Sequence, residues 1–196
     1  GGIQDTTDGC KFDDKALLNG VPPQYIGPDW EGARSDGEPF GHLKSILSNL
    51  TLSCSLGDVN LTSVSSYWKI KYASLGAYDY TSYGLAVSAI GETTDSFSQE
   101  LRLVTDFDGP LNLTLGGFYE KIDRQNYTDS LLLFVGPVPV GQPGAGRYDS
   151  FNSQNFAKAE TISGFGQLRW AITDQPELAG GVRYTKETRT QRIFNT

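Results

Sequence analysis

The sequence predicts an all-β fold in which about six long antiparallel strands pair as three hairpins. The clearest hairpin lies between Ser96 and Tyr119, where two alternating segments meet at the turn Asp106-Phe107-Asp108-Gly109-Pro110. Each arm holds about a dozen residues, whereas strands of soluble domains usually have about 5–6. The turns within the hairpins are short, and the loops between the hairpins are long. Strands of this length with one apolar and one polar face are typical of an antiparallel transmembrane β-barrel, of which this chain would be a fragment.

The first predicted hairpin covers about residues 43–72. The apolar side chains of its first arm alternate with polar ones, which places the two sets on opposite faces of a strand; they are Ile46, Leu50, Leu52 and Cys54. Gly57-Asp58 supplies the turn, since Gly accepts a positive φ. The apolar set of the return arm is Val64, Trp68, Ile70 and Tyr72.

The second predicted hairpin covers about residues 95–126. One face of its first arm carries Phe97, Gln99, Leu101, Leu103, Thr105 and Phe107. The other face carries Ser98, Glu100, Arg102, Val104 and Asp106. The return arm alternates again, because Leu111, Leu113 and Leu115 are separated by Asn112 and Thr114.

The third predicted hairpin covers about residues 160–190, with its turn at Asp174-Gln175-Pro176. Long loops are expected at about residues 73–94 and 127–159. Residues 1–42 have no periodicity and are rich in Pro, Gly and Asp, which predicts an extracellular loop. Residues 43–196 would then form the barrel portion. All short turns fall at one end and all long loops at the other, as in outer-membrane barrels with periplasmic turns and extracellular loops.

Aromatic and charged residues agree with this orientation. Trp170 and Phe107 lie near the short turns, and Tyr72, Tyr119 and Tyr184 lie towards the long loops, which predicts two interfacial aromatic belts. An Arg near the bilayer midplane on the lipid face would cost about 2–4 kcal/mol. The charged residues inside the spans are therefore expected to face the lumen; they are Glu100, Arg102, Arg169 and Arg183.

Composition excludes several classes of protein. A net charge of -7 argues against a nucleic-acid partner, which would require a basic surface. No segment approaches the 18 or so apolar residues of a membrane-spanning helix. The sequence begins at Gly1 without a signal peptide and contains no Met, which predicts an interior fragment of a longer protein. Cys10 and Cys54 are the only cysteines, and the sequence leaves their pairing open.

No motif of an enzyme, a cofactor or a metal site is apparent. His42 is the only histidine, and no serine has the surroundings of an activated nucleophile. Asp5, Asp8, Asp13 and Asp14 could hold Ca²⁺ through oxygen ligands, but their spacing is not that of an EF-hand loop, and solvated loop charge explains them better.

Three strings of residues resemble the β-barrel of TonB-dependent outer-membrane receptors, in particular the large group found in sphingomonads and related bacteria. The first is Phe97-Ser98-Gln99-Glu100-Leu101-Arg102-Leu103 with the turn that follows it. The second joins Gly164-Phe165-Gly166-Gln167-Leu168 to Gly181-Val182-Arg183-Tyr184, and the third is Leu61-Thr62-Ser63-Val64-Ser65-Ser66-Tyr67. The resemblance covers roughly residues 40–190.

This resemblance implies a barrel of about 22 strands in the outer membrane, surrounded by lipid and filled by an N-terminal plug domain. It also implies active uptake of a scarce nutrient, most often a ferric siderophore or another iron complex, energised by the TonB-ExbB-ExbD system through a plug that this sequence lacks. Neither catalysis nor a cofactor is implied. The candidate ligand contacts are aromatic and polar loop residues: Trp30, Tyr78, Tyr80, Tyr83, Tyr127, Arg147 and Tyr148. A passive porin or structural barrel is the alternative, and a secreted β-sandwich that binds carbohydrate or protein is the third reading.

Overall fold

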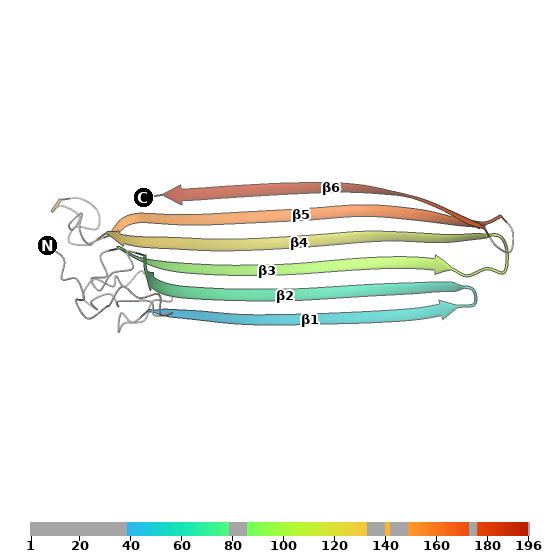
Figure 1. Ribbon diagram of the computed structural model, residues 1–196, viewed down its shortest axis with the longest axis horizontal. Helices are drawn as coiled ribbons and strands as arrows, with labels where there is room; N and C mark the ends of the chain where they lie inside the picture. Colours follow the sequence, from blue (N-terminus) through green and yellow to red (C-terminus); the bar gives the residue numbers. More distant parts are fainter. Residues whose placement is uncertain (1–38, 79–85, 133–139, 142–148, 173–175, 196) are drawn as a thin grey trace, which may run out of the picture.

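The described part of the chain forms a single antiparallel sheet of six strands in the order β1-β2-β3-β4-β5-β6 (Figure 1). A computed structural model describes residues 39–78, 86–132, 140–141, 149–172 and 176–195. The strands are β1 (Phe40–Leu56), β2 (Val59–Ala77), β3 (Ala86–Thr105), β4 (Leu111–Leu132), β5 (Asp149–Ala171) and β6 (Glu177–Asn195). They have 17 to 23 residues. The predicted fold class and the three hairpins are thereby confirmed.

The strands extend further towards the loop end than the alternation predicts. β2 continues to Ala77 and β3 starts at Ala86, so most of the loop expected at 73–94 is strand. β4 continues to Leu132 and β5 starts at Asp149, which likewise shortens the loop expected at 127–159. The extensions of β4 and β5 carry polar residues on both faces, so their hydrophobic periodicity is weak. Those of β2 and β3 alternate only over short runs, such as Val87 and Ala89 on either side of Ser88, and backbone pairing continues without a longer pattern. The extracellular loop expected at residues 1–42 lies almost entirely outside the described residues, and β1 already begins at Phe40.

Neighbouring strands pair in continuous register, so side chains form straight rows across the sheet. The one irregularity that the register shows is between Ser130 and Leu131, where β4 meets β5. Directly opposite residues point to the same face. We name the face with Leu101 and Leu103 the leucine face, and the face with Glu100 and Arg102 the arginine face.

The register corrects the expected orientation of β2. Tyr67 lies opposite Phe97 on the leucine face, whereas Tyr72 lies opposite Glu92 on the arginine face. The expectation that Tyr72 shares an aromatic belt with Tyr119 and Tyr184 is therefore wrong. Aromatic residues of β2 occur on both of its faces, so the sequence of β2 alone does not determine which face lies on which side of the sheet. Pairing with β3 determines it.

An apolar band covers the turn-side half of the leucine face. On β4 it runs from Leu111 to Tyr119, which matches the roughly 9–11 residues of a tilted bilayer crossing. Its side chains are exposed, as in Leu101 at 50% and Val182 at 75%. A β-sandwich would cover such a face with a second sheet. The described residues form one sheet only, which does not support the sandwich reading.

The buried apolar side chains lie at the loop end of the sheet. Leu75, Val87, Ala89 and Leu131 are each at most 2% exposed. Their rows are the last ones before the long loops. Among the described residues there is no helix with the length and apolar character to cross a membrane.

Candidate functional site

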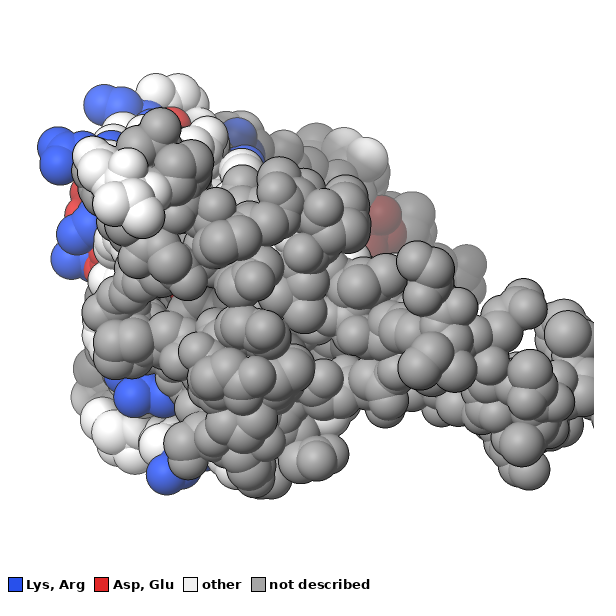
Figure 2. Space-filling view, turned by 90° about the vertical axis from the view of Figure 1, so that its left-hand side faces the viewer, with Lys and Arg blue, Asp and Glu red and all other residues white. Residues whose placement is uncertain are grey.

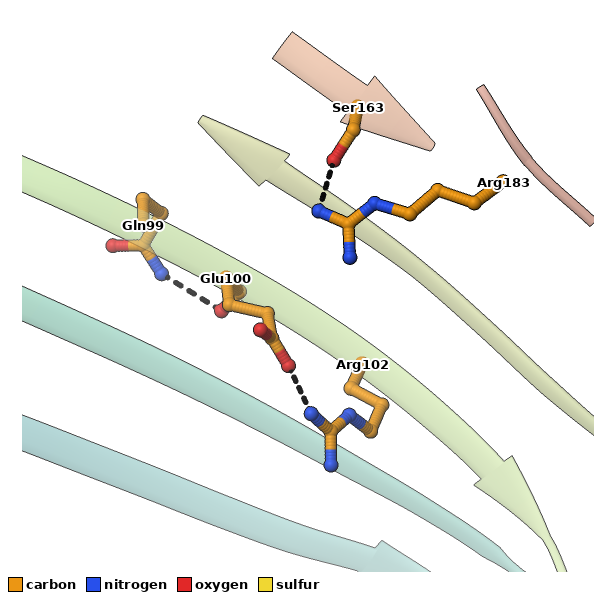
Figure 3. Close-up of polar contacts among 5 residues, drawn as sticks. All are labelled: Gln99, Glu100, Arg102, Ser163 and Arg183. Atoms are coloured by element: carbon orange, nitrogen blue, oxygen red, sulfur yellow. Dashed lines mark hydrogen bonds and ion pairs between the residues drawn. The ribbon is translucent and has the colours of Figure 1, made fainter. Parts of the chain in front are cut away.

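Charged side chains gather on the arginine face within the span of the apolar band. The register places the four predicted lumen residues on this one face: Glu100, Arg102, Arg169 and Arg183. The Arg102 guanidinium forms an ion pair with the Glu100 carboxylate on the same strand (Figure 3). Arg183 Nη2 donates a hydrogen bond to Ser163 Oγ at 2.8 Å, which links β6 to β5. The face thus presents positioned charges and hydrogen-bonding groups opposite an apolar surface.

A stack of three residues from neighbouring strands holds Arg183 in place. The Phe165 ring lies against Gly116 so closely that a Cβ atom there would be 2.1 Å from the ring. The guanidinium carbon of Arg183 lies 5.7 Å from the centre of the same ring, within the range of a cation–π contact. The ring therefore covers a glycine on one strand and supports a cation on another.

A row of charges on the leucine face marks the loop-side limit of the apolar band. The row runs directly across four strands through Lys69, Asp95, Asp123 and Lys158. Lys69 Nζ lies 2.8 Å from Asp95 Oδ1, and Lys158 Nζ lies 3.2 Å from Asp123 Oδ1. The Tyr67 hydroxyl donates to Asp95 Oδ1 at 2.9 Å, so an aromatic ring of the band is joined to the charged row.

A cavity of about 470 Å³, which we call the first cavity, lies on the loop side of this row. Most of its lining residues belong to three neighbouring rows of the leucine face. Its lining consists of His42, Lys44, Lys71, Tyr72, Ala73, Gly91, Glu92, Thr93, Gln125, Asn126, Tyr127, Asp129, Asn152, Gln154 and Phe156. Figure 2, which views the loop end of the molecule, shows Lys and Arg side chains along its left-hand edge, with acidic atoms between the upper ones.

A second cavity of about 290 Å³ lies close to the end of the hairpin between β2 and β3. Tyr78 lines it together with apolar and hydroxyl side chains of β3 and β4. The Ser88 and Ser130 hydroxyls are hydrogen-bonded across these two strands at 3.0 Å. This cavity is smaller and less polar than the first.

The structure describes two of the seven predicted ligand contacts, and it does not bring them together. Tyr127 lines the first cavity and Tyr78 the second. The other five lie outside the described residues: Trp30, Tyr80, Tyr83, Arg147 and Tyr148. Sequence reasoning missed the amides of the first cavity, Gln125, Asn152 and Gln154, because it placed two of them in a loop. Their positions do carry a signal, because each of the three lies an even number of residues from a leucine-face residue of its own strand, and the alternation therefore places it on that face.

Metal and thiol chemistry has little support in the described residues. They contain no group of three or more His, Cys, Asp and Glu side chains that could hold a metal ion. The acidic cluster from Asp5 to Asp14 lies outside them, as does Cys10. Cys54 is a free, exposed cysteine on the leucine face of β1. His42, expected at a junction, is part of β1 and lines the first cavity.

The fold and its two contrasting faces define a segment of the wall of an antiparallel β-barrel. The crystal structure of the ferric yersiniabactin uptake receptor FyuA from Yersinia pestis is similar, with a TM-score of 0.63 at 16% sequence identity. The match covers 81% of this chain and 22% of the receptor chain. At this identity, the similarity establishes that the chain shares the fold of a part of that receptor. The chain spans about a fifth of its length.

The siderophore receptor PiuA from Acinetobacter baumannii matches with a TM-score of 0.40 at 12% identity, over 80% of this chain and 30% of that one. A likeness this weak supports no conclusion about this chain. No protein-family model matches the sequence, and no curated protein matches it.

Proposed function

We propose that this chain is part of the barrel of a TonB-dependent receptor in the bacterial outer membrane. The observation that carries the proposal is the contrast between the two faces of the sheet. Exposed leucines cover one face over the length of a bilayer crossing, and paired charges occupy the other. The shared fold with the FyuA barrel supports the same reading. The leucine face would contact lipid, and the arginine face, with Glu100, Arg102, Arg169 and Arg183, would line the lumen.

The transported nutrient is proposed to be a ferric siderophore or another iron complex. FyuA is a ferric yersiniabactin uptake receptor, and the sequence strings resemble receptors that mostly take up iron complexes. The proposal includes a plug domain encoded elsewhere in the protein and the TonB-ExbB-ExbD system as its partner. Within this chain, Tyr78 and Tyr127 are proposed ligand contacts, as are the loop residues Trp30, Tyr80, Tyr83, Arg147 and Tyr148. The proposal that the receptor belongs to the group found in sphingomonads rests only on the resemblance of the sequence strings.

A passive porin is the competing function, since it would have the same two faces. The strings around Leu101 and Val182 favour the receptor, because a porin has no need of them. The two differ in their energy requirement: uptake through a porin follows a concentration gradient, whereas TonB-dependent uptake stops when the proton gradient collapses.

The test is iron uptake in cells that carry or lack the full-length gene. Cells grown under iron limitation are given radioactive iron bound to a panel of siderophores, with and without a protonophore. We expect one complex to be taken up only when the gene is present and the proton gradient is intact. Uptake that continues in the presence of the protonophore would identify a porin. Recovery of the full-length protein from the soluble periplasm would refute both.

A further inference from the structure

We propose that the second cavity, at the loop end of the arginine face, receives an aromatic ring carried by the transported nutrient. The inference rests on the proposed function, because it takes the arginine face as the lumen side of the barrel. It deepens that function by naming a chemical group of the nutrient and the wall residues that would select it.

The register places the cavity on the arginine face. Three successive cross-strand pairs of β3 and β4 line it, and each member lies an even number of residues from Glu100 or from Phe118, the direct partner of Glu100. The pairs are Ala86 with Leu132, Ser88 with Ser130, and Ile90 with Thr128. Tyr78 and Val87 also line the cavity. Because these rows are the last ones before the long loops, a nutrient that enters the lumen from outside would meet the cavity before the arginines further along this face.

The two serine hydroxyls of the cavity are engaged with the protein itself. The Ser88 hydroxyl donates a hydrogen bond to the backbone carbonyl of Asp129 at 3.2 Å, and its oxygen lies 3.0 Å from the Ser130 hydroxyl oxygen. Because a serine hydroxyl has one proton, Ser130 is the donor within the pair, and neither serine has a proton left for a ligand. None of the described lining residues is charged. The cavity therefore suits an uncharged, apolar group.

The charge in the adjacent row of the arginine face is paired. Glu92 lies one row beyond Ile90 on this face. Its carboxylate accepts a hydrogen bond from Arg124 Nη2 at 2.7 Å and another from the Thr94 hydroxyl at 3.1 Å. An apolar group beside Ile90 would therefore not have to displace water from an unpaired carboxylate.

The size of the cavity fits one group of a nutrient and not the whole of it. Its volume is about 290 Å³, whereas pockets that enclose a drug-sized molecule have about 300–1,000 Å³. An apolar cavity of about 150 Å³ is large enough for benzene. One aromatic ring would therefore enter the cavity, and the iron centre would stay outside it.

Tyr78 favours an aromatic ring over a hydrocarbon chain as the occupant. Its side chain lines the cavity and is 51% exposed, so part of its surface is open to a ligand. Its backbone N–H donates to the Ala86 carbonyl at 2.7 Å, which fixes its position at the end of the hairpin. Two aromatic rings attract each other beyond the burial of their surface. A rigid ring also loses less conformational entropy on binding than a flexible chain does.

The test compares three ferric complexes that differ in one group only. Benzohydroxamate, acetohydroxamate and hexanohydroxamate each form a neutral tris complex with Fe³⁺ through the same oxygens, and they carry a phenyl ring, a methyl group and a pentyl chain. Calorimetry in the presence of excess hydroxamic acid gives the affinity of each complex for the full-length protein, purified from outer membranes in detergent.

Two alanine substitutions form a matched pair. Ala86→Phe fills the cavity with a ring of the protein itself. Ala157→Phe is the control, because Ala157 lies opposite Arg124 on the same face but does not line the cavity, and both alanines are half-buried. Since all proteins are measured in the same detergent, the control also accounts for partition of the complexes into micelles.

We expect the wild type and Ala157→Phe to bind the phenyl complex at least about tenfold more tightly than the methyl complex, because the ring leaves water. Ala86→Phe should abolish this preference. If Ala86→Phe does not fold, Tyr78→Leu, at an exposed position, decides the question: it should weaken binding of the phenyl complex severalfold and leave that of the methyl complex unchanged.

Three outcomes would overturn the inference. The first is no binding of the phenyl complex, or equal affinities for the phenyl and methyl complexes. The second is a preference that persists in Ala86→Phe, or in Tyr78→Leu where that variant decides. The third is a pentyl complex that binds as tightly as the phenyl complex, which would exclude the aromatic ring as the selected group. Uptake of iron that needs the gene and the proton gradient would support the proposed function even then, whereas a soluble protein would refute both.

Discussion

At the scale of single residues, aromatic rings that cover glycines are the most specific contacts of the sheet. Phe165 covers Gly116 on the arginine face, and Tyr127 covers Gly91 on the leucine face. A glycine in a strand exposes backbone and packs nothing, and a ring from the neighbouring strand compensates for both deficits. The sequence did not predict either pair, because the alternation pattern of each strand does not specify its register with the next.

The Gly116–Phe165 pair gives a residue-level prediction. Gly116→Ala would place a Cβ atom 2.1 Å from the ring, so Phe165 would have to leave and Arg183 would lose its support. We expect the full-length protein to be destabilised by about 1–3 kcal/mol, measured as the free energy of unfolding in urea with lipid vesicles present.

The adjacent Gly117 is the control for this prediction. A Cβ atom at Gly117 would have its nearest neighbour at 3.9 Å, an ordinary contact distance. Gly117→Ala should therefore leave the stability nearly unchanged. Equal effects of the two substitutions would mean that the ring does not rest on Gly116.

At the scale of elements, hairpins with two-sided strands were predictable and their loop-side extensions were not. The turn at Gly57-Asp58 is confirmed, and Gly57 has a φ of 63°, in the left-handed region that favours glycine. The alternation of β3 and β4 near their turn is confirmed by the register. On the loop side of Asp95, Thr93, Glu92 and Gly91 interrupt the alternation, so the pattern that identifies a strand weakens while the strand continues to Ala86.

The turn between β1 and β2 gives the first prediction at this scale. Gly57→Ala should destabilise the protein by about 1–2 kcal/mol, because a side chain in the left-handed region clashes with its own backbone. Gly109→Ala, in the next short turn, is the control, since no left-handed φ and no atom within 4 Å oppose it. Chemical denaturation of both variants compares them, and a Gly57→Ala protein as stable as wild type would contradict the role of this turn.

The faces of β3 give the second prediction. Leu101→Arg places a charge in the middle of the apolar band and should cost about 2–4 kcal/mol if that band contacts the bilayer midplane. Ser98→Arg, on the opposite face of the same strand, lies across from Glu120 and should be tolerated. The free energy of folding into vesicles measures both. A tolerated Leu101→Arg would show that the leucine face does not contact lipid.

At the scale of the whole molecule, the described strands form an open wall. β1 and β6 each pair with one neighbour, so each has one unpaired edge. Their residues are almost all exposed. A barrel removes such edges by closing, and an open sheet with free edges tends to pair with other chains.

If the chain is part of a closed barrel, as proposed, the isolated 196-residue chain should associate in detergent, whereas the full-length protein, in which these edges are paired, should stay monomeric. Light scattering coupled to size-exclusion chromatography gives the mass of each. A stable monomer of the isolated chain would indicate that the loops, or a rearranged sheet, protect the edges of β1 and β6.

The register of the sheet, which shifts only between Ser130 and Leu131 in the described strands, also determines how this wall can change over time. One inserted or deleted residue within β3, for example, would turn every following side chain of that strand to the opposite face. In the proposed barrel, leucines would then meet water and arginines would meet lipid. Only substitutions, or the insertion of two residues at once, leave each following side chain on its own face. The segments between strands carry no such constraint. Length variation among homologous proteins should therefore be concentrated between Ala77 and Ala86 and between Leu132 and Asp149. In these two segments, changes in length and sequence can alter binding specificity without shifting the register of the strands.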